Sequence, residues 1–263
     1  MKMIIQGIYE AGLSLTLRNA ILIIGFFTLT IHAAWYAKKL NESVWKSLLT
    51  LWAGNTLTLS CMAFFSAVHS GQNFFSIDFL SSLPDLPLTM LHGFIYFPIV
   101  SIPMARLLKI DAAKINDATA ITSILYQGIG HIGCVFACCC YGYPFKYGIY
   151  NALTKTFVFP VQLFDAFSCI LISVFLAIYF KKKQYNTRGV LYPLMLLVYG
   201  FVRLIWEFAR DNKKIWLVFS VDAIHSLSLI LVGAFGLFIV SYFNYKNDYK
   251  KAQKAKRNHK KKK

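Results

Sequence analysis

Runs of about twenty apolar residues recur along this 263-residue chain, and they constrain its fold more than any other feature. The hydrocarbon core of a bilayer is about 30 Å thick, which a helix of about twenty residues crosses. The composition agrees, because 57% of the residues are hydrophobic and only 15% are charged, whereas about 25% are charged in a typical soluble domain. We therefore predict an all-α, polytopic membrane protein.

We predict about seven transmembrane helices. No pattern of a cleavable signal is evident near the start, so we expect the first apolar run to remain as a membrane anchor. No internal repeat is evident, which argues against an inverted-repeat transporter. The predicted spans are Leu13–Tyr36, Ser47–Val68, Leu88–Leu108, Ala118–Cys138, Pro160–Phe180, Val190–Phe208 and Ile215–Phe243.

The orientation follows from the basic residues between these spans. The first, third and fifth connections carry clusters of Lys and Arg, whereas the second, from His69 to Pro87, carries none. Because positive charge is retained on the cytoplasmic side, we predict that the N-terminus lies outside and the C-terminus inside. The basic clusters are Lys38, Lys39 and Lys46; Arg106, Lys109 and Lys114; and Lys181, Lys182, Lys183 and Arg188.

The net charge of +17 is concentrated at the C-terminus, where ten basic residues lie between Lys246 and Lys263. Such a run is typical of a solvated tail near anionic lipid headgroups, and contact with nucleic acid is the less favoured reading. We therefore expect one transmembrane domain, residues 1–245, followed by a disordered basic cytoplasmic tail, residues 246–263. Its expected partners are anionic membrane lipids and not nucleic acid.

A cysteine-rich stretch, Gly128 to Gly142, holds four of the six cysteines of the chain beside His131. On a helix, His131, Cys134 and Cys138 fall on one face. Ionisable groups at membrane depth usually face a cavity or a partner. We therefore predict that this stretch forms the wall of an intramembrane pocket.

Several chemical roles for the cysteine-rich stretch remain open. Gly128-x-Gly-x-x-Gly133 matches the dinucleotide-binding string, but no strand precedes it. His131, Cys134 and Cys138–Cys140 could bind a soft metal, although their spacing is not that of a known zinc ligand set. A disulfide, a redox-active thiol and plain packing of small polarisable side chains are the other readings.

Polar residues within the other spans have both structural and functional readings. His92 could act as a general base, or it could be satisfied by a neighbouring helix. Arg203 and Glu207 could form an ion pair at i, i+4, or Arg203 could bind phosphate with help from Arg210. A structural role is the favoured reading for Asp165, which shares a helix face with Gln162 and could act as a capping or stabilising charge at the helix start. Structural pairing is also favoured for Asp222 and His225.

Four segments, in this order, resemble motifs of the prolipoprotein diacylglyceryl transferase family. His92-Gly93 is similar to the family's His-Gly-Gly element, and the signature helix keeps Gly130, Ile132, Gly133 and Gly142. Within that helix, His131, Cys134 and Cys139 stand where the family has Arg, Asn and Glu. Two later elements are similar to Pro-x-Gln-Leu-Tyr-Glu and Tyr-Gly-x-x-Arg-Phe-x-x-Glu-Phe-x-Arg; here they contain Pro160, Gln162, Leu163, Phe164 and Asp165, then Tyr199, Gly200, Arg203, Glu207, Phe208 and Arg210.

This resemblance implies a bacterial inner-membrane transferase. It would move the diacylglyceryl group of phosphatidylglycerol to the lipobox cysteine thiol of a prolipoprotein and release glycerol phosphate, and we expect neither a cofactor nor a metal ion. A non-catalytic or thiol-redox lipid-binding protein on the same scaffold is the alternative, and a small-solute transporter is the third.

The resemblance also implies roles for individual residues. His92 would be the base, Arg203 would hold the phosphate with Arg210 or protonated His131, and Glu207 would orient Arg203. The implied catalytic residues are therefore His92, His131, Arg203 and Glu207, and the implied substrate-binding residues are Gly93, Gly130, Gly133, Cys134, Cys139, Gln162, Tyr199 and Arg210.

Overall fold

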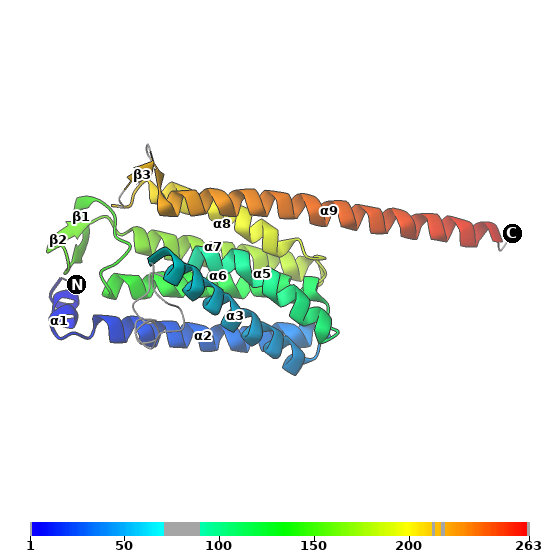
Figure 1. The fold of residues 1–263 in the computed structure, drawn as a ribbon, viewed down its shortest axis with the longest axis horizontal. Coiled ribbons are helices and arrows are strands. Elements are labelled where there is room, and N and C mark those ends of the chain that lie inside the picture. Colours follow the sequence, from blue (N-terminus) through cyan, green and yellow to red (C-terminus); the bar gives the residue numbers. More distant parts are fainter. Residues whose placement is uncertain (1, 71–89, 212–213, 217–218, 262–263) are drawn as a thin grey trace.

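Long helices running along a common direction form most of the molecule (Figure 1). The computed structural model describes residues 2–70, 90–211, 214–216 and 219–261. Within these ranges a short helix, α1 (Lys2–Glu10), precedes seven longer ones. These are α2 (Ser14–Lys39), α3 (Val44–Ser70), α5 (Met90–Leu107), α6 (Ala112–Phe136), α7 (Val161–Lys182), α8 (Leu191–Glu207) and α9 (Val221–Lys261).

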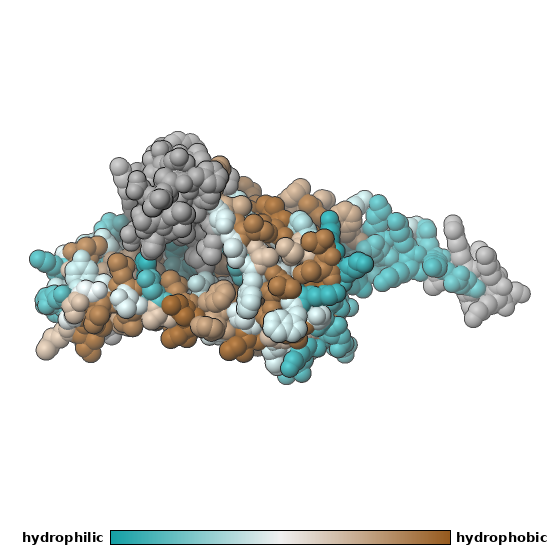
Figure 2. Space-filling view, turned by 60° about the horizontal axis from the view of Figure 1, so that its bottom comes forward, coloured by the Kyte–Doolittle hydropathy of each residue, from teal (hydrophilic) through white to brown (hydrophobic). Residues whose placement is uncertain are grey.

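Each predicted span corresponds to one of the seven longer helices, so the prediction of an all-α polytopic membrane protein is confirmed. Among the described residues, four helical segments are long and apolar enough to cross a membrane. Apolar side chains are prominent on the body of the bundle, whereas the far part of α9 is hydrophilic (Figure 2). Seven crossings and an outside N-terminus remain predictions. The four segments are Ser14–Lys39, Ala112–Phe136, Val161–Lys182 and Val221–Lys254.

The connections that carry the basic clusters lie together. The chain turns after α2, after α5 and after α7 at one end of the bundle, and the C-terminus extends from this same end (Figure 1). The opposite end holds α1 and two small hairpins. This arrangement agrees with the alternation of basic and non-basic connections, although the second connection lies mostly outside the described residues.

The two antiparallel hairpins are not predicted from the sequence. One pairs β1 (Pro144–Asn151) with β2 (Thr156–Val158), and the other pairs β3 (Lys214–Trp216) with β4 (Phe219–Ser220). The first depends on a side chain, because Asn151 Oδ1 accepts N–H bonds from the two residues after Ala152 and its Nδ2 donates to the carbonyl of Cys138. The second shortens the last predicted span, since α9 begins at Val221 and not at Ile215.

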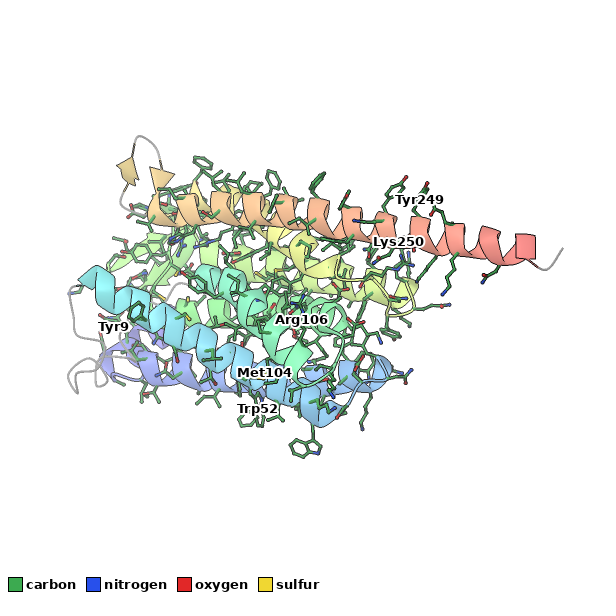
Figure 3. All side chains as sticks on the ribbon, turned by 45° about the vertical axis from the view of Figure 1, so that its right-hand side comes forward. Tyr9, Trp52, Met104, Arg106, Tyr249 and Lys250 are labelled. Carbon is green, nitrogen blue, oxygen red and sulfur yellow. The ribbon has the colours of Figure 1, made fainter. Side chains whose placement is uncertain are left out.

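The basic C-terminal segment is helical in the described residues, and the expectation of a disordered cytoplasmic tail stays a prediction. Residues 246–261 continue α9 as helix beyond the bundle, and Tyr249 on this part lies at the opposite end of the molecule from Tyr9 on α1 (Figure 3). Lys, Ala, Gln and Arg dominate the segment and have high helix propensity, which favours the continuation.

Two contacts fix the helices that carry the polar residues. Asp117 on α6 is buried and accepts hydrogen bonds from the hydroxyl of Thr187 and from the backbone N–H groups of Gly189 and Leu191, which ties the start of α8 to α6. Gly233 on α9 lies directly against α8, because a Cβ atom there would sit 2.5 Å from the backbone nitrogen of Leu197. Only glycine permits this approach.

Candidate functional site

The ends of four helices meet near the hairpins and present a group of polar side chains. These are the last turns of α6 and α8 and the first turns of α7 and α9 (Figure 1). By the predicted orientation this is the outer end of the bundle. The site is built from segments that are far apart in the sequence, so its geometry depends on helix packing.

Asp165, in the first turns of α7, lies at the centre of this group. Its side chain is fully buried, and its Oδ2 accepts a hydrogen bond from Nη1 of Arg203 at 2.6 Å. The same oxygen lies 3.0 Å from Nε2 of His131. Gln127, one helical turn before His131, contacts that ring nitrogen at 2.9 Å. A carboxylate on α7 therefore joins a cation of α8 to the imidazole of α6.

Asp222, in the first turn of α9, joins two arginines. Its Oδ2 lies 3.3 Å from Nη2 of Arg203 and 2.9 Å from Nη1 of Arg210. The Asp222 side chain is 20% exposed, whereas the side chains of Arg203, Arg210 and Glu207 are at most 5% exposed. Asp222 is therefore the member of this ionic cluster that solvent reaches most easily.

Glu207 lies near Arg203, which the resemblance implies it orients, and also contacts Ser220 and Arg210. Its Oε1 accepts a hydrogen bond from the hydroxyl of Ser220 at 2.6 Å, and its Oε2 lies 3.4 Å from Arg210. The distance from Glu207 to Arg203 is longer, 3.8 Å. Asp165 and Asp222 therefore orient Arg203 more closely than Glu207 does, and Glu207 mainly links α8 to the start of α9.

The charges of this ionic cluster nearly balance. The three carboxylates of Asp165, Glu207 and Asp222 face the guanidinium groups of Arg203 and Arg210, and protonation of His131 would make the sum zero. Burial of so many charges is tolerated only because they are paired.

Among the buried polar atoms without a hydrogen-bond partner in the described residues, four belong to Arg203, Arg210, His131 and Gln162. They include the Nε donors of both arginines, and an unsatisfied buried donor costs about 1–3 kcal/mol. Such atoms are candidates for contact with a bound group. They are Nε of Arg203, Nε of Arg210, Nδ1 of His131 and Oε1 of Gln162.

A cluster of three thiols borders the ionic cluster. The sulfur atoms of Cys134, Cys139 and Cys140 all lie within 4.8 Å of one another. Cys138 points elsewhere, because it is buried in a hydrophobic cluster with Ile5 and other residues of α1, α6 and β1. The prediction that His131, Cys134 and Cys138 share one functional face is therefore wrong for Cys138, since α6 ends at Phe136.

Two thiols beyond the end of α6, those of Cys139 and Cys140, have shifted pKa values. Hydrogen bonds from Cys134 and Cys139, together with the positive charges of His131 and Arg203, hold the pKa of Cys140 well below its ordinary value against the effect of burial. The hydrogen bond from Cys134 lowers the pKa of Cys139, but the hydrogen bond to Cys140 and burial outweigh it and raise the value to about 12. Cys140 is therefore the thiol of this pair that ionises first.

The remaining residues implied by the resemblance lie at varied distances from the ionic cluster. Gln162 donates to the carbonyl of Cys139 at 2.8 Å and so joins α7 to the cysteine-rich turn. Tyr199 is fully buried, with its ring 5.8 Å from that of Phe94. His92 lies on α5, but its side chain is outside the described residues.

The implied glycines have mainly packing contacts. A Cβ atom at Gly130 would lie 3.4 Å from Leu22, and one at Gly133 would lie 3.3 Å from Arg18, so both glycines face α2. Gly93 lines a mainly apolar cavity between α2, α3, α5, α6 and α8, and neither Arg203 nor Arg210 belongs to its lining.

From the sequence, Asp165 is expected to be a capping or stabilising charge and Asp222 to pair with His225, whereas Gln127 and Ser220 are not singled out. The signal for Asp165 is its place in the Pro160–Asp165 element, one helical turn after Gln162. No local pattern connects Asp222 with residues of α8.

The fold and the site define a polytopic helical membrane protein with a buried ionic cluster at one end of its bundle. The sequence profile described as prolipoprotein diacylglyceryl transferase matches residues 19–239, and the chain belongs to this family.

Two curated relatives support the assignment. The chain is 32% identical over 133 residues to the phosphatidylglycerol–prolipoprotein diacylglyceryl transferase of Clostridium tetani, a match that covers 48% of this chain and 53% of the relative. It is 26% identical over 113 residues to phosphatidylglycerol–prolipoprotein diacylglyceryl transferase 2 of Clostridium perfringens, covering 40% and 43%. The matches therefore span about half the length of these relatives or less.

Proposed function

We propose that this protein transfers the diacylglyceryl group of phosphatidylglycerol to the lipobox cysteine thiol of a prolipoprotein in the bacterial inner membrane, with release of glycerol phosphate. One observation carries the proposal beyond family membership. Arg203 and Arg210 converge on one carboxylate, Asp222, and each keeps a buried Nε donor without a partner among the described residues. Paired guanidinium groups bind oxyanions such as phosphate through parallel charge-assisted hydrogen bonds.

Asp222 would exchange with the phosphate of the lipid. It is the most exposed carboxylate that contacts both arginines, whereas Asp165 is fully buried behind Arg203. An anionic phosphodiester that displaced Asp222 would occupy the same donors and could also reach the two Nε groups. Asp165 would then hold Arg203 in place while the phosphate binds, and Glu207 would do the same for Arg210.

The arginines would also act on the leaving group. When the glycerol carbon passes from oxygen to sulfur, negative charge develops on the departing phosphate, and fixed guanidinium groups stabilise that charge in a site of low dielectric constant. His131 would add a further positive charge when it is protonated. His92 on α5 is the proposed base for the acceptor thiol.

Transfer of labelled diacylglycerol from phosphatidylglycerol to a synthetic lipobox peptide by the purified full chain tests this proposal. Arg203→Ala removes the central guanidinium, and Arg188→Ala is the matched control, since Arg188 is half exposed and pairs with Asp248 far from the site. We expect transfer that disappears in Arg203→Ala and persists in Arg188→Ala. Absence of transfer by folded wild-type protein would contradict the proposal.

The second candidate is a lipid-binding protein of the same family without transferase activity. The charges of the ionic cluster favour this lipid-binding alternative, because its three carboxylates already neutralise the two arginines. Under this alternative, phosphatidylglycerol would bind to the wild-type chain and the peptide would never be modified. The helical basic extension of α9 would bind anionic lipids of the opposite leaflet under either candidate.

A further inference from the structure

The three clustered thiols form a set of ligands whose function the ionic cluster does not explain. Zinc–sulfur bonds are about 2.3 Å long, so thiolates around a tetrahedral zinc ion lie about 3.8 Å apart. The sulfur atoms of Cys134, Cys139 and Cys140 lie within 4.8 Å of one another, which is close to that spacing. Cys134 lies five and six positions before the other two, so the chain must fold back to bring them together.

The backbone around these thiols is fixed in the form that brings them together. Cys138 and Cys140 both have φ in the left-handed region, 55° and 57°, which L-residues rarely adopt. The N–H of Cys139 donates to the carbonyl of Cys134 at 3.1 Å, and Gln162 holds the carbonyl of Cys139. Gly142 then packs against the end of α8, where a Cβ atom would lie 2.5 Å from the carbonyl oxygen of Ala209.

We propose that Cys134, Cys139 and Cys140 bind a zinc ion through three thiolates and leave its fourth position open for the acceptor thiol of the lipobox cysteine. The role of the open position for the acceptor thiol depends on the proposed transferase function, whereas zinc binding by the three thiolates does not. Three protein ligands with an open position are typical of catalytic zinc sites, and structural sites have four. Thiolate ligands select zinc or Cu(I) over harder ions.

The surroundings favour an open fourth position. In the described part of the chain, no fourth His, Cys, Asp or Glu belongs to this ligand group. His131 is the nearest histidine in the sequence, but its Nε2 is engaged by Gln127 and Asp165. A zinc ion with three thiolates has a net charge of −1, and positive charge from Arg18, His131 and Arg203 acts on these cysteines.

The bound metal would supply the nucleophile. A thiol that coordinates zinc loses its proton, which would pass to a base or to water. The thiolate sulfur would attack the glycerol carbon that bears the phosphate ester, so that a carbon–sulfur bond forms while the carbon–oxygen bond breaks. The departing glycerol phosphate takes the bonding electron pair, and zinc does not change its oxidation state.

Metal analysis of the purified full chain tests the ligand set. After reduction and loading with zinc alone, we expect one zinc ion per wild-type chain, and at least a tenfold weaker zinc affinity in Cys139→Ser and Cys140→Ser. Cys138→Ser is the matched control, because Cys138 neighbours both ligands but lies in the hydrophobic cluster. Unchanged zinc affinity in both ligand variants, or loss of zinc in Cys138→Ser as well, would overturn the site.

Cobalt substitution tests the open position and also gives a readout on wild-type protein, independent of whether variants fold. Co(II) bound by three thiolates has a sulfur-to-metal charge-transfer band, which we expect to strengthen when a lipobox cysteine peptide is added but not when its serine analogue is added. No change with the cysteine peptide would overturn the acceptor role.

A transfer assay separates failure of this inference from failure of the proposed function. Transfer that persists in protein shown to contain no metal would overturn the zinc role and leave the transferase intact. Zinc binding and peptide ligation without transfer of diacylglycerol would support the site and contradict the proposed function.

Discussion

Removal of the Arg203 guanidinium should destabilise the protein strongly, because it leaves Asp165 buried with too little positive charge. Asp165 is 0% exposed, and Arg203 Nη1 is its closest cationic partner at 2.6 Å. Breaking a buried ion pair by removing one partner costs about 3–5 kcal/mol, most of which is the penalty for the charge that remains. Met at position 203 keeps much of the side-chain volume and removes the charge, so Arg203→Met isolates this effect.

A second substitution shows how much of the lost stability comes from the Arg203–Asp165 pair. In Arg203→Met, the further change Asp165→Asn removes the uncompensated charge and should recover part of the loss. Contacting residues in such networks have coupling energies of about 0.5–3 kcal/mol, and we expect a value in the upper half of that range because both side chains are buried. If the two residues did not interact, the losses of stability in the two single variants would add in the double variant.

Thermal unfolding followed by intrinsic fluorescence in one detergent provides the measurement. For a chain of this size about 1 kcal/mol changes Tm by roughly 2–4 °C. Arg203→Met should therefore lower Tm by about 6–20 °C, and the double variant should melt above it. Arg188→Met, in the exposed pair with Asp248, is the control and should change Tm by less than about 3 °C. A Tm shift in Arg203→Met as small as that of the control, or additive costs in the double variant, would refute the reasoning.

Three further predictions follow from individual contacts. Asp222→Asn should increase the apparent affinity for phosphatidylglycerol severalfold in the transfer assay, because it removes the carboxylate that competes with phosphate for both arginines; a weaker affinity would contradict the exchange role of Asp222. Gly233→Ala should destabilise the bundle by about 1–3 kcal/mol, since its Cβ would meet the backbone of α8 at 2.5 Å, whereas Gly7→Ala, with nothing within 4 Å, should leave Tm unchanged. Asp117→Leu should cost more than about 2 kcal/mol in unfolding experiments, because the backbone donors of Gly189 and Leu191 lose their acceptor; equal stability would show that other groups satisfy them.

Much of the fold follows from the sequence alone, because the length of an apolar run determines whether a helix can cross a bilayer. All seven runs correspond to helices, and most ends differ by a few residues, whereas α9 begins at Val221 and continues to Lys261, well beyond the predicted end at Phe243. Asp111, for example, caps α6 through the N–H of Ala113 and starts that helix six residues before the predicted span. The hairpins were missed because their stability comes from contacts with distant segments, and a short strand has little local signal.

For the site, the sequence determined which residues carry charge, and the family elements singled out Arg203, Glu207 and Arg210 before any geometry was known. Only the tertiary structure decided which carboxylates those arginines meet. Asp165 and Asp222 come from α7 and α9, 38 and 19 positions from Arg203. Periodicity along one helix contains no information on such pairs, since they depend on how the helices pack.

The cysteines show the same division most clearly. Their number and proximity in the sequence suggested several chemistries, and helical periodicity grouped Cys134 with Cys138. The end of α6 at Phe136 and two left-handed residues reversed that grouping, so that Cys134 meets Cys139 and Cys140 while Cys138 enters the hydrophobic cluster. The sequence supplied the thiols, and the turn decided which of them can share a ligand, because one change in backbone direction alters where every following side chain points.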